Sequence, residues 1–176
     1  DPSPVLRPGW FRRDATFDAA IAAQFLPELE SVQAGGLTDW DTAGPLGVLA
    51  HIVVLDQFSR NVFRGSPKGF AGDGLALALA KQLVASGADR ELTPEQRLFA
   101  YLPYEHSEDL ADQAESLRLF TALVVDAPGL QGLLDYAVAH HKVIAQYGPN
   151  SDQMASLGLK KKSERRAPVR SSKPSG

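Results

Sequence analysis

The stretch that decides the fold is LGVLAHIVVLDQFSRNVFRG, which spans Leu46–Gly65. Its first half is almost entirely apolar, at a spacing that leaves little polar surface on a helix, so it predicts a central helix over about 42–60. Its second half presents hydrogen-bonding side chains in quick succession, at Asp56, Gln57, Arg60, Asn61 and Arg64. A buried helix that ends in so many polar groups indicates either a binding cleft or a tie between helices.

Helical spacing of apolar residues continues on both sides of this stretch, and strand-like alternation is nearly absent. Pro27 is expected to end or kink the first helix, and Pro103 to end the fourth. Thr93 and Gln96 form a capping-box pattern with Pro94 at the first helical position. Together these signals predict six helices, over about 14–27, 42–60, 73–85, 93–102, 107–125 and 130–147.

Short connections between six helices predict an all-α fold of antiparallel helix pairs. A chain of 176 residues is long enough to bury a sizeable core as one domain, which we place at 1–149. No internal repeat of fixed period is visible, so the residues themselves do not predict a repeat array.

The composition excludes several classes of protein. The sequence has no cysteine, which excludes disulfides, thiolate metal sites and a cysteine nucleophile and fits a reducing cytosol. Its apolar runs are well short of the ~20 residues that a membrane helix needs, and no signal-peptide pattern opens the sequence. We therefore expect a cytoplasmic protein that does not enter membranes.

The charge is distributed unevenly along the chain. Residues 1–149 hold 11 Lys and Arg against 19 Asp and Glu, whereas residues 150–176 hold 7 against 2. We expect this basic tail, rich in Ser, Pro and Gly, to be disordered. It has no aromatic residue and no DNA-reading helix, so it gives little reason to expect nucleic-acid binding.

The first candidate site lies in the opening stretch. Asp56 and Arg60 are four residues apart, as are Gln57 and Asn61, so each pair can meet on one helix face. One interpretation is an intrahelical salt bridge with a helix cap. The other is a cleft in which Gln57, Arg60 and Arg64 hold an anion, because the guanidinium group matches carboxylate and phosphate geometry.

The second candidate site is PYEHSEDLADQAE, which begins at Pro103. A histidine beside carboxylates, here Glu105, His106 and Glu108, is typical of acid–base chemistry or of a metal site. The alternative is a solvated helix start stabilised by the helix dipole, which we expect for Asp109 and Asp112. Glu105 and His106 follow the aromatic Tyr104 and fit either interpretation.

The third candidate is the histidine pair in AHHKVIAQYG, His140 and His141. Adjacent residues project about 100° apart on a helix, so the two rings cannot easily face one ligand. The sequence has no zinc-protease motif, no serine-hydrolase elbow and no phosphate-binding glycine loop. No spacing of residues requires a metal, and no cofactor is predicted.

Three ordered segments resemble the signatures of the bacterial DUF924 family, namely LDQFSRNVFRGSPKGFAGD, YLPYEHSED and YAVAHHKVIAQYG. The resemblance covers about 10–148, and WFRRDATFDAAIAAQF also fits. It implies an all-helical, TPR-like arrangement of helix pairs, but no established activity. It carries over these polar residues: Asp56, Gln57, Arg60, Asn61, Arg64, Asp73, Glu105, His106, Glu108 and His140. Ser59 stands where the family usually has proline.

The resemblance ends after Tyr147 and Gly148. There the family continues with Arg-Phe-Pro-x-Arg-Asn, whereas this chain continues with PNSDQMASLG and the basic tail. Our hypothesis is a change in reading frame or gene end, which an intact, in-frame tail on genomic resequencing would refute. If the family's site needs both Arg-Asn elements, this chain would bind its ligand poorly.

Two functions are compatible with the sequence. In the first, a helical enzyme or binding protein holds a small anion in a polar cleft that also includes Tyr104. Its proton-handling residues would be His106 with Glu105 or Glu108, and His140. In the second, a non-catalytic TPR-like module binds a peptide or protein, and the polar residues lock its helices together. The reaction, the ligand and any cofactor are not predicted.

Overall fold

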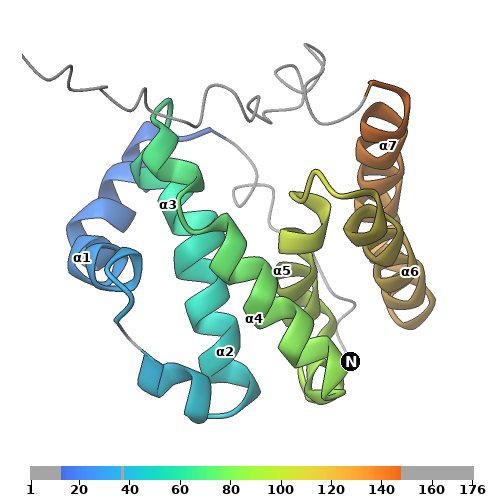
Figure 1. The fold of residues 1–176 in the computed structure, drawn as a ribbon, viewed down its shortest axis with the longest axis horizontal. Helices are drawn as coiled ribbons and strands as arrows, with labels where there is room; N and C mark the ends of the chain where they lie inside the picture. The colour runs from blue at the N-terminus through green and yellow to red at the C-terminus, as the bar shows by residue number, and fades with distance from the viewer. Residues whose placement is uncertain (1–12, 37, 148–176) are drawn as a thin grey trace, which may run out of the picture.

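The computed structural model describes residues 13–36 and 38–147, and this part consists of helices joined by turns and short loops, with no strand (Figure 1). The all-α prediction is therefore confirmed. The predicted tail at 150–176 lies outside the described residues. Among the described helices, none is long and apolar enough to cross a membrane.

Helix α1 spans Ala15–Gln33 and begins where the sequence predicted. The side chain of Asp14 caps it by accepting hydrogen bonds from the backbone N–H groups of Thr16 and Phe17. Of the two outcomes expected at Pro27, an end of the helix was wrong, because α1 continues for six residues beyond it, and a kink stays a prediction. Leu29 and Val32 are both buried in that last part, so core packing holds the helix together past the missing N–H group.

The central helix is built from α2, Pro45–Val53, a π-helical turn, Val54–Phe58, and α3, Ser59–Val62. It begins three residues later than predicted. A 3₁₀ turn at Thr38–Thr42 precedes it, and Gly44 then adopts a φ of +87°, which a residue with a side chain rarely does.

Four further helices complete the fold, and two of their ends differ from the prediction. Helix α5 runs through Pro103 to Glu105, because much of its length is buried and packing outweighs the roughly 3 kcal/mol that an interior proline costs. Helix α6 begins after Asp109, whose carboxylate accepts from the N–H of Ala111. The bounds are α4, Asp73–Ala85, α5, Pro94–Glu105, α6, Leu110–Asp126, and α7, Gln131–Tyr147.

Short 3₁₀ turns connect several of these helices, at Pro67–Phe70, Ala88–Glu91 and Pro128–Leu130. Helix α4 packs on α2 and α5, α5 packs on α6, and α6 packs on α7, so the chain advances by neighbouring helices (Figure 1). A TPR-like superhelix is compatible with this succession and stays a prediction. The core follows the same path, with fully buried side chains at Leu29, Ile52, Leu98, Phe120 and Leu123.

Candidate functional site

The site begins at the π-helical turn of the central helix. The carbonyl of Val54 accepts from the backbone N–H of Ser59, five residues on, and also from the Ser59 hydroxyl at 3.2 Å. This turn holds Asp56 in the protein interior, where it is 0% exposed. Wide turns of this kind recur at functional sites because they redirect side chains that a regular helix would place elsewhere.

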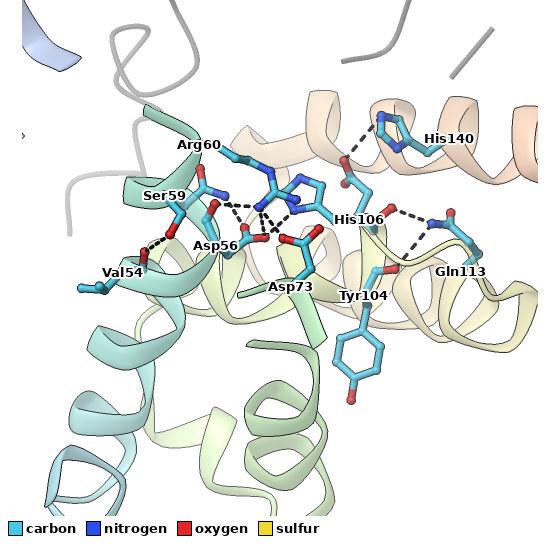
Figure 2. Close-up of polar contacts among 11 residues, drawn as sticks. Val54, Asp56, Ser59, Arg60, Asp73, Tyr104, His106, Gln113 and His140 are labelled. Atoms are coloured by element: carbon cyan, nitrogen blue, oxygen red, sulfur yellow. Dashed lines mark hydrogen bonds and ion pairs between the residues drawn. The ribbon is translucent and has the colours of Figure 1, made fainter. Parts of the chain in front are cut away.

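Asp56 is the centre of a polar cluster (Figure 2). Its Oδ1 lies 2.7 Å from Nδ1 of His106 and 2.8 Å from Nη1 of Arg60, and its Oδ2 accepts from the Gln57 amide. Burial by itself would raise the pKa of Asp56, but the charges of His106 and Arg60 and the hydrogen bonds outweigh it. The pKa of Asp56 falls to about 2, so its carboxylate stays ionised.

Arg60 joins the central helix to α4. Its Nη1 donates to the Asp56 carbonyl at 2.7 Å and to Oδ1 of Asp73 at 2.9 Å, and the guanidinium carbon lies 5.2 Å from the centre of the Phe70 ring. Gly72 makes the approach of α4 feasible, because a Cβ there would lie 2.9 Å from the Leu55 carbonyl. The predicted Asp56–Arg60 salt bridge is thus present as part of a larger network.

His106 follows the last residue of α5, and α6 fixes the backbone around it. The amide nitrogen of Gln113 donates to the carbonyls of Glu105 and Ser107, each at 2.6 Å. These carbonyls lie at a helix end, where they would otherwise lack a partner. Sequence reasoning missed Gln113; the only signal was a polar residue on the buried face of α6, on the same side as Ser116 and Phe120.

A cleft of about 440 Å³ opens beside this cluster. Its polar wall comes from the central helix and the end of α5, and its other wall comes from α7. Side chains of both kinds line it: Gln57, Arg60, Leu102, Glu105, His106, Leu133 and Tyr136, with Gly132. His106 reaches it with a side chain that is 16% exposed, and Arg60 with one that is 21% exposed.

Glu105, which lines this cleft, forms a second buried acid–histidine pair with His140 of α7 (Figure 2). Glu105 Oε1 and His140 Nε2 are 4.0 Å apart, and both side chains are 2% exposed. Burial, opposed by the charge of His106 and helped by the negative charge of Asp56, raises the pKa of Glu105 to about 7. Burial likewise lowers the pKa of His140 to about 4, so both groups are neutral over much of the range between.

Two residues predicted for the first candidate site contact helix α1 and not the Asp56 cluster. Asn61 donates to Asp18 at 2.7 Å, and Arg64 forms two hydrogen bonds with the same carboxylate, each at 2.9 Å. The two arginines therefore form ion pairs with different acids: Arg60 with Asp56 and Asp73, and Arg64 with Asp18. The predicted pairing of Gln57 with Asn61 is replaced by the contacts of Gln57 with Asp56 and of Asn61 with Asp18.

Other predicted residues are placed away from the cleft. The Tyr104 ring is buried and points away from the cluster (Figure 2). Glu108 lies between α5 and α6 and does not line the cleft. Asp109 is an exposed cap, as expected, but the expectation of a solvated Asp112 was wrong. Asp112 is buried, accepts from the Ser107 hydroxyl and pairs with Lys81.

The histidines outside the cleft add no site. His51, which sequence reasoning did not assign, is buried on α2, with Nδ1 2.8 Å from Asp41. His141 is only half-buried, next to the buried His140, as their helical offset requires. Within 13–36 and 38–147, no three His, Asp or Glu side chains converge as a metal-binding group.

The fold and this cluster define a helical protein with a polar cleft at the end of its central helix. The family model described as a bacterial protein of unknown function, DUF924, matches residues 3–157. The chain therefore belongs to the DUF924 family.

A solved structure supports the same conclusion. A protein of unknown function from Agrobacterium tumefaciens is 29% identical, with a TM-score of 0.71, over 90% of this chain and 86% of that chain. No curated protein matches the sequence.

Proposed function

We propose that the cleft binds a small anionic molecule, with Arg60 meeting its acid group and His106 acting as a proton acceptor. The observation that carries this proposal is the Asp56–His106 contact of 2.7 Å at the edge of the cleft. It brings an ionised, fully buried carboxylate against one ring nitrogen of a histidine whose side chain reaches the cleft.

The carboxylate of Asp56 gives this histidine a defined chemical role. An ionised acceptor at Nδ1 favours the form of neutral His106 with its proton on Nδ1. Nε2 then keeps a lone pair that can accept a proton from a bound molecule, and the imidazolium that forms is stabilised by Asp56. Glu105, with its pKa near 7, is a neighbouring group able to exchange protons near neutral pH.

Arg60 supplies the only arginine side chain on the cleft wall within the described chain. Its contacts with Asp56 and Asp73 all use Nη1, so the guanidinium plane is held in one orientation. A fixed guanidinium recognises carboxylate or phosphate with little loss of side-chain entropy. These features support an anionic group on the ligand.

One observation favours a second function. Arg60 and Arg64 are each engaged by carboxylates from other helices, as expected if the signature residues tie the fold together. The protein would then be a non-catalytic interaction module that binds a peptide or protein partner. The two functions differ in whether a small molecule occupies the cleft.

Gly132 offers a clean way to test occupancy. It lies on α7 at the cleft, and a Cβ added there meets no atom within 4 Å. Gly132→Phe therefore fills the cleft without altering the Asp56 cluster. Gly74→Phe is the matched control, because Gly74 is also the second residue of a helix, is exposed and has open space around it.

The experiment measures thermal unfolding with a panel of small carboxylates and phosphates. A ligand present at 100 times its dissociation constant raises the free energy of unfolding by ~2.7 kcal/mol. We expect such a shift in the wild type and in Gly74→Phe but not in Gly132→Phe. Arg60→Lys should show a smaller shift, because lysine keeps the positive charge but lacks the paired N–H donors of the guanidinium group. A panel with no hit, or a hit that Gly132→Phe leaves intact, would refute the proposal and favour the interaction module.

A further inference from the structure

A second cavity lies next to the cleft and is of a different kind. It measures about 320 Å³, and its walls are Phe17 and Ile21 of α1, Val53 and Phe58 of the central helix, and Phe99 of α5, with Gln57 and Asn61. Phe17 is 43% exposed at this cavity. Aromatic and aliphatic surface of this sort, left partly open to water, is typical of a binding surface rather than of a core.

The two cavities share one residue and follow the same pair of helices. Gln57 lines both of them. On α5, Phe99 lines the apolar cavity and Leu102 lines the cleft, and residues three apart lie on the same side of a helix. Both cavities therefore adjoin Gln57 and are lined by the central helix and α5, with α1 beside one cavity and α7 beside the other; the two together are called the groove.

We infer that the ligand is amphipathic: a carboxylate or phosphate group beside Arg60, joined to an unbranched alkyl chain that passes Gln57 and fills the apolar cavity. This inference rests on the proposed function, because it takes the acid group to lie in the cleft. Gln57 is the residue that the chain would pass, because it lines both cavities, and its amide is already engaged by Asp56 Oδ2.

The polarity of the groove changes along its length in the way such a ligand requires. Arg60, Glu105 and His106 lie at the cleft, whereas the apolar cavity has no ionisable side chain on its described walls. Burying a methylene group there is favourable by about 0.8 kcal/mol, or roughly a fourfold gain in affinity. A polar or doubly charged extension would lose its hydration without gaining a partner.

The test is a chain-length series measured by calorimetry at concentrations below micelle formation. The probes are acetate, butanoate, hexanoate and octanoate, with the matching monoalkyl phosphates and, as head-group controls, the matching alkylamines. We expect affinity to rise roughly fourfold per methylene until the cavity is full, for the carboxylates or the phosphates, and not for the amines. The series that responds identifies the acid group.

Two variants place the chain in the apolar cavity. Val53→Phe fills the cavity, and Phe17→Asp puts a carboxylate at its open side on a residue that the fold does not bury. Each is expected to abolish the gain from longer chains while leaving the affinity for short acids unchanged. Val125→Phe, on an exposed position of α6, is the matched control and should behave as the wild type.

The outcomes separate this inference from the proposed function. Short acids that bind at the cleft with no gain from added methylenes would overturn the inference and leave the proposed function standing. A gain that persists in both Val53→Phe and Phe17→Asp would also overturn it, because the chain would then lie elsewhere. A failure of every acid to bind would overturn the proposed function and the inference together.

Discussion

The two buried acid–histidine pairs of this protein differ in how many partners their acid has. Asp56 contacts His106, Arg60 and Gln57, and its pKa falls to about 2. Glu105 faces His140 at 4.0 Å, and its pKa rises to about 7. Both acids are almost completely buried, so burial alone does not decide whether a carboxyl group is charged.

Under the proposed function, this difference gives the two pairs separate tasks. A carboxylate held by several donors fixes geometry, and here it orients His106 and Arg60 toward the cleft. A carboxyl group without a close cation changes its protonation near neutral pH and so is suited to handling protons.

The largest effect is expected at Asp56. Asp56→Ala leaves Arg60 and His106 facing each other without their shared acceptor, and removing one member of a buried ion pair destabilises by roughly 3–5 kcal/mol. Urea unfolding of the variant at pH 7 measures this loss. Asp39→Ala, at an exposed position, is the control. A loss below about 1 kcal/mol would mean that the Asp56 network does not hold the helices together.

The Glu105–His140 pair is expected to appear in the pH dependence of stability. The folded-state pKa of Glu105 lies near 7, above its ordinary 4.5, so its contribution to stability is complete below pH 4.5 and is lost as the pH rises through 7. Glu105→Gln abolishes that loss. The free energy of unfolding of Glu105→Gln, measured relative to that of the wild type, should therefore rise by up to about 3 kcal/mol between pH 4.5 and pH 8.

His140 gives the opposite slope, which makes a matched experiment. Its folded-state pKa is near 4, below its ordinary 6.5, so its contribution is present above pH 6.5 and is lost as the pH falls through 4. The free energy of unfolding of His140→Gln, measured relative to that of the wild type, should rise by about 3 kcal/mol as the pH falls from 6.5 to below 4. Chemical unfolding at a series of pH values measures both differences. Parallel curves for the wild type and the two variants would contradict the assignment.

A smaller effect is expected at Gln113, which supports the backbone of both pairs. Gln113→Ala leaves the buried carbonyls of Glu105 and Ser107 without their donor, at a cost of about 1–3 kcal/mol in unfolding free energy. Gln131→Ala, whose side chain contacts only the exposed face of α7, should change stability little. Equal stability of the two variants would show that Gln113 is not needed to hold the end of α5.

The smallest effect is expected at an exposed ion pair. Arg118 contacts Glu115 through two hydrogen bonds of 2.6 and 2.8 Å, geometry as good as that at Arg60, but its side chain is 59% exposed. Arg118→Ala should change the free energy of unfolding by no more than about 0.5 kcal/mol, because water competes for both charges. A loss of unfolding free energy as large as that of Asp56→Ala would show that burial does not explain the different strengths of the Asp56–Arg60 and Glu115–Arg118 ion pairs.

Sequence patterns predicted the helices well because their signals are local. The capping box of Thr93 and Gln96 starts α5 as expected, with reciprocal hydrogen bonds of 2.9 and 3.4 Å. The two errors at prolines have one cause. Pro27 and Pro103 lie in helices whose following residues are buried, and tertiary packing outweighs a local preference.

The site was predicted only in part because its contacts are not local. Residue patterns singled out Asp56, Glu105, His106 and His140, and the family resemblance added Asp73. Neither source predicted the contact of Asp56 with His106. The contact of Arg64 with Asp18 spans 46 positions, and only the packing of α1 on the central helix creates it. The position of Gln113 on the buried face of α6 was a signal, but its partners were not predictable, since they are backbone carbonyls.

The most direct test of the account is the position of the proton on neutral His106, measured by nitrogen-15 NMR of its ring at alkaline pH. His106→Gln assigns the signal by removing it. We expect a proton on Nδ1, held by Asp56, and an unprotonated Nε2 whose resonance moves when a small acid binds the cleft. A proton on Nε2 would contradict it, because His106 could then accept no proton from a ligand in the cleft.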